Sequence, residues 1–288
     1  MFGPALSAPL VAWLIAGTSW RWSFFITGAV GLVWVVVWLA FVSTPERTSW
    51  IPEPERQRIL AERHGGEVVP VGGVGYKGLL RSPAMWGLAI SQGCAVYSVY
   101  LYLSWLPNYL QTARGLSIVN SGLFTSVPFL VGGVVIILTN WIGDKILTTR
   151  TMRNGGRRIV VVACLLLCSV GLAIPFVDSL TAVVVLTIFP VSFGGTASAT
   201  NAALANDLLR SQADAGRAFA FMVLGGNVFG LLAPIVTGYI VQITGSFSSA
   251  FVLAGGLSLI GAGVSFGLTR YTLGEEVPVA VGFARGAG

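Results

Sequence analysis

The chain has 288 residues, of which 55% are hydrophobic and only 10% are charged, and its formal net charge is +6. A soluble domain carries about 25% charged residues, so this composition excludes an ordinary soluble globular protein and favours a membrane protein. The basic Lys and Arg residues lie in short loops between apolar runs rather than on one continuous face. We therefore expect no nucleic-acid partner.

Apolar runs long enough to cross a bilayer follow one another along the chain. A transmembrane helix needs about 20 predominantly apolar residues. Eight runs of that kind contain no Lys, Arg, Asp, Glu or His: residues 2–18, 23–42, 84–110, 121–142, 159–177, 180–206, 218–243 and 249–268. The sequence therefore predicts an all-α polytopic membrane protein with eight transmembrane helices, two before a long polar stretch and six after it.

The long polar stretch, residues 43–82, contains several prolines and glycines and is predicted to be a linker. With eight alternating spans, all 17 Lys and Arg residues except Arg21 and Arg114 fall on one side of the bilayer. Cytoplasmic loops are enriched in these residues. The linker, the loops 143–158 and 207–217 and both termini are therefore predicted to be cytoplasmic, in a protein of the cell inner (plasma) membrane.

The cysteines and the spans offer little for covalent or metal chemistry. Cys94, Cys164 and Cys168 all lie in apolar runs, and their odd number predicts no disulfide framework. Cys164 and Cys168 are one helical turn apart, and two small packing residues explain them better than a metal pair. The spans hold no His and no carboxylate, so we expect no enzyme, no metal and no cofactor. No ring of charges points to a channel.

The third run carries polar side chains at helical spacing. Gln92 is followed by Tyr97, Tyr100 and Ser104. Polar residues inside a membrane bundle face its interior, where they line a substrate pocket or form hydrogen bonds between helices. We predict that Gln92, Tyr97 and Tyr100 bind substrate, and interhelical packing remains an equal alternative.

The seventh run combines Asn227 with a glycine-rich stretch, residues 225–230, and with Pro234. Glycine at these positions predicts a helix that packs closely on a neighbour. An unpaired amide in hydrocarbon costs roughly several kcal/mol, so Asn227 must face a partner, water or substrate. We predict that Asn227 contacts substrate. Asn201 of the sixth run lies nearer the cytoplasmic end, where packing or gating is the simpler interpretation.

The loop between the fourth and fifth runs begins with an acid and ends with two arginines, Asp144 and Arg157 with Arg158. Such a pairing can form an ion-pair latch that gates the cytoplasmic side. The alternative is that the arginines only set the topology of the chain.

Several short motifs are shared with one known family. The chain resembles the major facilitator superfamily, and within it the anion:cation symporter branch of sugar-acid, tartrate and phthalate permeases and sialin-like carriers. Residues 2–4 and 20–22 look like the family's fifth helix and its junction with the sixth. Asp144 with Arg157 and Arg158 resembles the loop between its eighth and ninth helices, with a longer insertion. Residues 226–238 and 244–247 look like its eleventh helix and the turn into the twelfth.

The resemblance implies two six-helix halves joined by a cytoplasmic linker. Residues 1–43 then hold the last two helices of the N-terminal half, 44–82 the linker, 83–270 a complete six-helix C-terminal half and 271–288 a cytoplasmic tail. The chain thus resembles family helices five to twelve, and we expect an N-terminally truncated reading frame.

The resemblance also implies a function. It implies a secondary active transporter of small organic anions, carboxylates or sugar acids, that works by alternating access in the lipid bilayer with the proton as coupling ion. The spans contain no carboxylate to carry that proton. The alternative is therefore a truncated, transport-inactive fragment that serves at most as a membrane scaffold.

Overall fold

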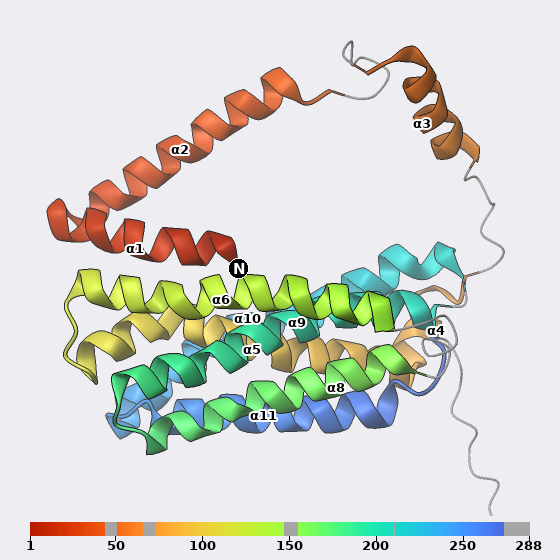
Figure 1. The fold of residues 1–288 in the computed structure, drawn as a ribbon. Coiled ribbons are helices and arrows are strands. Elements are labelled where there is room, and N and C mark those ends of the chain that lie inside the picture. Colours follow the sequence, from red (N-terminus) through yellow and green to blue (C-terminus); the bar gives the residue numbers. More distant parts are fainter. Residues whose placement is uncertain (44–50, 66–72, 147–154, 210, 274–288) are drawn as a thin grey trace, which may run out of the picture.

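The computed structural model describes residues 1–43, 51–65, 73–146, 155–209 and 211–273, and within them all regular structure is helical (Figure 1). The elements are α1 (Phe2–Gly17), α2 (Trp20–Phe41), α3 (Glu53–Gly65), α4 (Gly75–Arg81), α5 (Pro83–Thr112), α6 (Ile118–Ile146), α8 (Gly156–Cys168), η1 (Ser169–Phe176), α9 (Leu180–Leu208), η2 (Gln212–Asp214), α10 (Ala215–Thr244) and α11 (Ser248–Leu268). The predicted all-α polytopic fold is confirmed.

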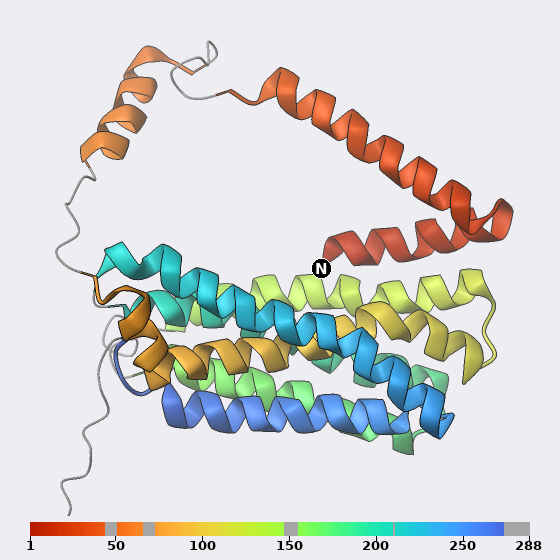
Figure 2. The same ribbon diagram turned by 180° about the vertical axis from the view of Figure 1, so that it is seen from behind.

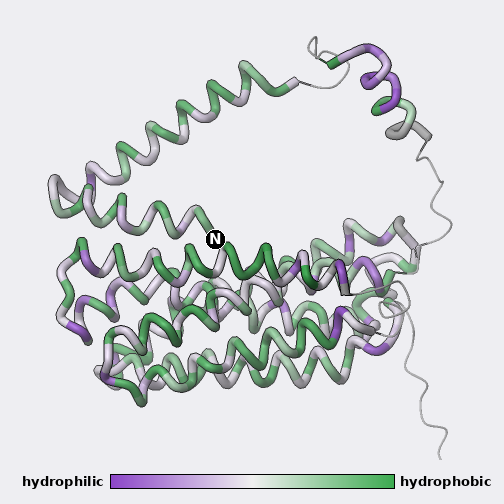
Figure 3. The backbone as a smooth tube through the Cα atoms, in the orientation of Figure 1, coloured by the Kyte–Doolittle hydropathy of each residue, from purple (hydrophilic) through white to green (hydrophobic). Residues whose placement is uncertain are grey.

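Six helical segments of the described chain are long and apolar enough to cross a membrane. They are α2, Ile118–Gly143 of α6, the continuous Gly156–Phe176, α9, α10 and α11. Helix α1 is apolar but has only 16 residues. Helix α5 has 30 residues, but its polar side chains dilute its hydropathy. The count of eight therefore stays a prediction. Figure 3 shows apolar residues along the helix shafts and hydrophilic residues on α3 and at the helix ends.

Helix α5 is the central element of the bundle. It packs against α9, α10 and α11 and, less extensively, against α6 (Figures 1 and 2). Helices α8 and η1 contact α9 and α11 on the far side, and α6 packs between α9 and α1. Consequently, side chains of α5 face several neighbours at once, and any polar group on it must find its partner on another helix.

Glycines set the closest approach between α5 and α10. A Cβ added at Gly225 would lie 2.8 Å from the carbonyl oxygen of Ala89, and one at Gly226 would lie 3.1 Å from the Gln92 side chain. On the opposite helix, a Cβ at Gly93 would lie 2.6 Å from the Phe229 ring. A larger residue at these points would displace the backbone or side chains of the other helix, as expected for membrane helices held by van der Waals packing.

The apolar core has two parts. At the end where α5 finishes, Tyr102 stacks on Phe251 with ring centroids 5.7 Å apart, and Tyr109 meets Phe247 and Phe251 edge-on at 5.4 and 5.1 Å. At the end where α5 begins, apolar side chains from α4, α5, α8, α9, α10 and α11 form a second cluster, in which Leu79 is 1% exposed. The bundle is therefore packed at both ends.

The fifth predicted span is helical, but its character changes along its length. The α-helix α8 continues directly as the 3₁₀ segment η1. Pro175 lies inside η1 and has no N–H to donate, and a Cβ at Gly171 would lie 2.5 Å from the Tyr102 hydroxyl. The tighter helix thus coincides with a crowded contact against α5.

The first two helices differ in how they meet the bundle. Helix α1 packs along α6, where a Cβ at Gly122 would lie 2.5 Å from the Ala12 side chain. Helix α2 turns back and diverges from the bundle, and Ser23 is its one buried residue (Figures 1 and 2). Its apolar side chains, Trp34 and Trp38 among them, are exposed. A face of this composition suits contact with lipid or with other membrane helices.

Candidate functional site

A cluster of amide and hydroxyl groups joins α5 to α9. Gln92 is 7% exposed; its Nε2 donates to the Ser198 hydroxyl at 2.7 Å, and its Oε1 accepts from Asn201 Nδ2 at 3.1 Å. Asn201 Nδ2 also donates to the Leu88 carbonyl at 3.0 Å, and its Oδ1 accepts from the Ser91 hydroxyl at 3.4 Å. The cluster is uncharged, and the two amides satisfy each other as buried polar groups in a membrane require.

Another side of α9 reaches α6. The Thr200 hydroxyl donates to Asn140 Oδ1 at 3.3 Å, and Asn140 Nδ2 donates to the Ile136 carbonyl at 2.8 Å. Polar contacts therefore run from α5 across α9 to α6. This arrangement can position uncharged hydrogen-bonding groups in the bundle interior.

Gln92 and Tyr100 lie on the stripe of α5 that faces the glycines of α10. A Cβ at Gly226 would touch Gln92, and one at Gly230 would lie 3.6 Å from the Tyr100 ring. Tyr100 is 41% exposed. Asn227 lies between these two glycines in sequence and is exposed, with no hydrogen bond to the described part of the chain. Of the predicted residues, Gln92 and Tyr100 thus lie on one α5–α10 seam, and Asn227 is the exposed neighbour of Gly226 on α10.

Tyr97 occupies a different environment from the other predicted residues. It is 2% exposed, and its hydroxyl has no hydrogen-bond partner among the described residues. The hydroxyl of Thr237 on α10, equally buried, lies near it and also lacks a partner with hydrogen-bond geometry. The two hydroxyls form a second polar spot on the α5–α10 contact.

The predicted latch residues are described only in part. The Asp144 side chain lies outside the described residues, so its pairing stays a prediction. Arg157 forms an ion pair with Asp207 at 2.6 Å, which joins the start of α8 to the end of α9. Arg158 has its guanidinium 5.6 Å from the centre of the Phe266 ring, and its Nε is buried without a partner in the described chain. The arginines thus hold helix ends together.

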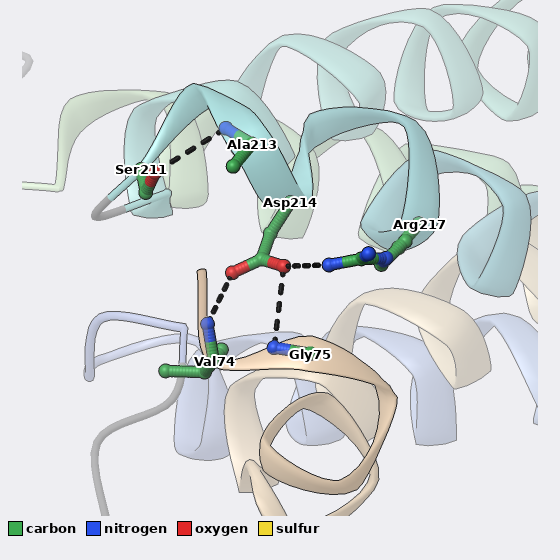
Figure 4. A network of polar contacts seen from close by, with 6 residues as sticks. All are labelled: Val74, Gly75, Ser211, Ala213, Asp214 and Arg217. Carbon is green, nitrogen blue, oxygen red and sulfur yellow. Dashed lines mark hydrogen bonds and ion pairs between the residues drawn. The ribbon is translucent and has the colours of Figure 1, made fainter. Parts of the chain in front are cut away.

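A second polar junction lies at the same end of the bundle (Figure 4). Asp214, which is 3% exposed, accepts hydrogen bonds from the backbone N–H groups of Val74 at 2.7 Å and Gly75 at 3.3 Å. Arg217 donates to the same carboxylate at 3.0 Å, and its guanidinium lies 5.5 Å from the centre of the Tyr76 ring. The junction ties the last segment before α5 to the loop between α9 and α10.

Comparison with known proteins decides the family. The model of the Major Facilitator Superfamily matches residues 1–155 and 152–284. The chain belongs to the Major Facilitator Superfamily. With its apolar helices, this makes it a multi-pass membrane protein.

Similar proteins in the superfamily are named as transporters, not as enzymes. The hexuronate transporter of Bacillus subtilis is 30% identical over 95% of this chain and 63% of its own length. The probable sulfoacetate transporter SauU of Cupriavidus necator is 31% identical over 90% of this chain and 60% of its own. The D-galactonate transporter of Escherichia coli is 27% identical over 90% of this chain and 62% of its own length. The chain thus spans about three fifths of the length of these relatives.

Some polar residues of the candidate site in this superfamily member were identified only from the structure. Ser198 and the pairing of Gln92 with Asn201 were not predicted. Gln92 and Asn201 both lie about two helical turns from the linker end of their antiparallel helices, so matching depths could have paired them. Asp214 carried no such signal, because its distant partners are the backbone N–H groups of Val74 and Gly75. The described chain holds no cluster of three potential metal ligands.

Proposed function

We propose that this chain carries small organic anions, carboxylates or sugar acids, as a secondary active transporter that works by alternating access. The observation that carries the proposal is the similarity to a hexuronate transporter along 95% of this chain. The relatives named for hexuronate, galactonate and sulfoacetate share one chemistry, a small organic acid that is anionic at neutral pH.

The geometry of the α5–α10 seam supports this function. Gln92, Tyr100 and Asn227 present uncharged donors and acceptors within the spans, and carriers bind substrate on membrane helices rich in glycine and proline. We propose that they, with Tyr97, hydrogen-bond to the hydroxyl and carboxylate groups of the substrate. Asn227 is exposed, so its amide has hydrogen-bonding capacity to spare for a ligand.

We further propose how the chain is divided and placed. Residues 1–43 would be the last two helices of the N-terminal half, 44–82 the linker, 83–270 the six-helix C-terminal half and 271–288 a cytoplasmic tail. The bias of Lys and Arg toward one side supports an inner-membrane protein with both termini cytoplasmic.

Gating and coupling complete the proposal. Asp144, Arg157 and Arg158 would act as a cytoplasmic latch, and the Arg157–Asp207 ion pair supports closure of that end. The proton would be the coupling ion. The predicted spans contain no carboxylate or histidine, so a coupled proton would have to be carried by a group outside these spans. Uptake with and without an imposed pH gradient tests the coupling.

The substrate residues are tested by uptake of labelled hexuronate in cells that express the chain. Asn227→Ala should reduce uptake at least tenfold while the amount of protein in the membrane stays normal. Asn108→Ala is the matched control, because Asn108 is also an exposed asparagine but lies at the far end of α5. Unchanged uptake in Asn227→Ala would remove Asn227 from the site. No uptake in the unaltered chain would favour a non-transporting membrane scaffold.

A further inference from the structure

A cavity of about 290 Å³ lies where α1 meets the far end of α5 and the beginning of α6. Most of its wall is apolar, from side chains such as Ile15, Leu103 and Phe129. Its polar residues are Ser7, Gln111, Ser121 and Thr125. A small, mostly apolar hollow with a few convergent polar groups is the usual form of a ligand site.

The Thr125 hydroxyl is the notable group in this wall. Thr125 is 1% exposed, and its Oγ1 has no hydrogen-bond partner among the described residues. Threonines inside membrane helices usually donate to the carbonyl one turn earlier, as Thr187 and Thr196 do here at 2.7 and 2.9 Å. An unpaired buried hydroxyl is costly, which points to a partner that the cavity would hold.

Gln111 of α5, which is half-buried, adds a second polar group to the wall. Its Nε2 donates to the Ser121 hydroxyl at 3.0 Å, and that hydroxyl donates to the Ile118 carbonyl at 2.7 Å. The amide oxygen of Gln111 accepts no hydrogen bond from the described chain, so it remains an acceptor. The cavity therefore offers a hydroxyl that can both donate and accept, and a carbonyl that accepts.

We propose that this cavity binds the hydroxyl-bearing part of a polyhydroxylated acid, and this proposal rests on the proposed function. No charged residue lines the cavity, so a carboxylate there would lose hydration without a counter-charge. A sugar hydroxyl instead donates to Gln111 and exchanges a hydrogen bond with Thr125. The carboxylate end of the ligand would lie outside this cavity.

The position of the cavity gives it a second role in the proposed cycle. Its walls come from α1, which precedes the linker, and from α5 and α6, which follow it. Helices α1 and α6 touch closely at Gly122, beside the cavity. Any movement of α1 against α6 would open or close this cavity, so hydroxyl recognition would be coupled to that movement.

The test compares two six-carbon ligands on the purified full chain. Glucuronate carries hydroxyls, and adipate is a dicarboxylate without them. Thr125→Val should weaken glucuronate binding about threefold to tenfold, the value of one hydrogen bond, and should leave adipate binding within about twofold. Thr125→Ser keeps the hydroxyl and should restore glucuronate affinity. Ser126→Ala is the matched control, because this adjacent hydroxyl donates to the Leu123 carbonyl and does not line the cavity.

The outcomes separate this inference from the proposed function. The site would be overturned if Thr125→Val left the glucuronate affinity unchanged or weakened the binding of glucuronate and adipate equally. It would also be overturned if only detergent or an acyl chain occupied the cavity. Glucuronate that binds with the expected selectivity but is not taken up would keep the site and overturn transport. Uptake of glucuronate with no effect of Thr125→Val would keep transport and overturn the site.

Discussion

Asp214 and Val74 lie 140 positions apart in sequence, yet the Asp214 carboxylate accepts a 2.7 Å hydrogen bond from the Val74 N–H (Figure 4). Asp214 is the N-cap residue of α10, but its side chain makes no capping bond to that helix. The carboxylate instead binds the segment that leads into α4. The segment that leads into α4 is therefore fastened to the loop between α9 and α10.

Asp214→Ala should release that segment. The charge-assisted hydrogen bonds to Val74 and Gly75 would be lost, which costs about 2 kcal/mol, or roughly a thirtyfold faster exchange of these amides. Hydrogen–deuterium exchange of the purified protein measures this directly. Asp178→Ala removes the same charge from an exposed loop and should leave the two amides protected. Equal exchange in the two variants would contradict the attachment.

The Gln92–Asn201 contact predicts a coupled pair. Asn201→Leu should destabilise the protein because Gln92 Oε1 loses its donor, and Gln92→Leu should do the same from the other side. The double variant Gln92→Leu/Asn201→Leu should be less destabilised than the sum of the two single variants. The difference, which is the coupling energy, should be about 0.6 to 1.7 kcal/mol, as for other membrane hydrogen bonds. Unfolding of the detergent-solubilised protein measures the cycle, and strictly additive losses would refute the pairing.

Gly225→Ala tests the close approach of α10 to α5. The new methyl group would meet the Ala89 carbonyl at 2.8 Å, so one helix must shift, at a cost of about 1–3 kcal/mol. Gly256→Ala on α11 is the control, since a Cβ there meets nothing within 4 Å. The control should be neutral or slightly more stable, because alanine favours helix. A thermal shift of similar size in both variants would contradict the packing.

Orientation is checked by thiol labelling in intact cells. The three native cysteines are buried, so an introduced one dominates the signal. Ser117→Cys in the exposed turn between α5 and α6 should react with a membrane-impermeant maleimide from outside. Lys77→Cys on α4 should react only after the cells are opened. The reverse pattern would place the linker outside the cell.

The sequence predicted the class of fold because charge-free runs and loop arginines are strong signals in a membrane protein. It identified Gln92 as a buried polar group for the same reason, since an amide in an apolar run must find a partner. It could not identify the partner, because Ser198 and Asn201 lie more than 100 positions away and only packing brings them close.

Other features escaped the sequence for different physical reasons. Thr125 stands out only through a hydrogen bond that it lacks, and Asp214 through bonds to backbone N–H groups, which every residue except proline carries. The 3₁₀ segment η1 depends on the local crowding of Gly171 against Tyr102. None of these features can be predicted from hydropathy or from residue spacing.

The most direct measurement of the central claim is uptake of labelled hexuronate into liposomes that contain this protein alone. We expect accumulation that saturates with substrate, exceeds that of empty liposomes and rises when an inward proton gradient is imposed. A protonophore should abolish the rise. Uptake no greater than in empty liposomes, from protein shown to be folded and inserted, would contradict the account.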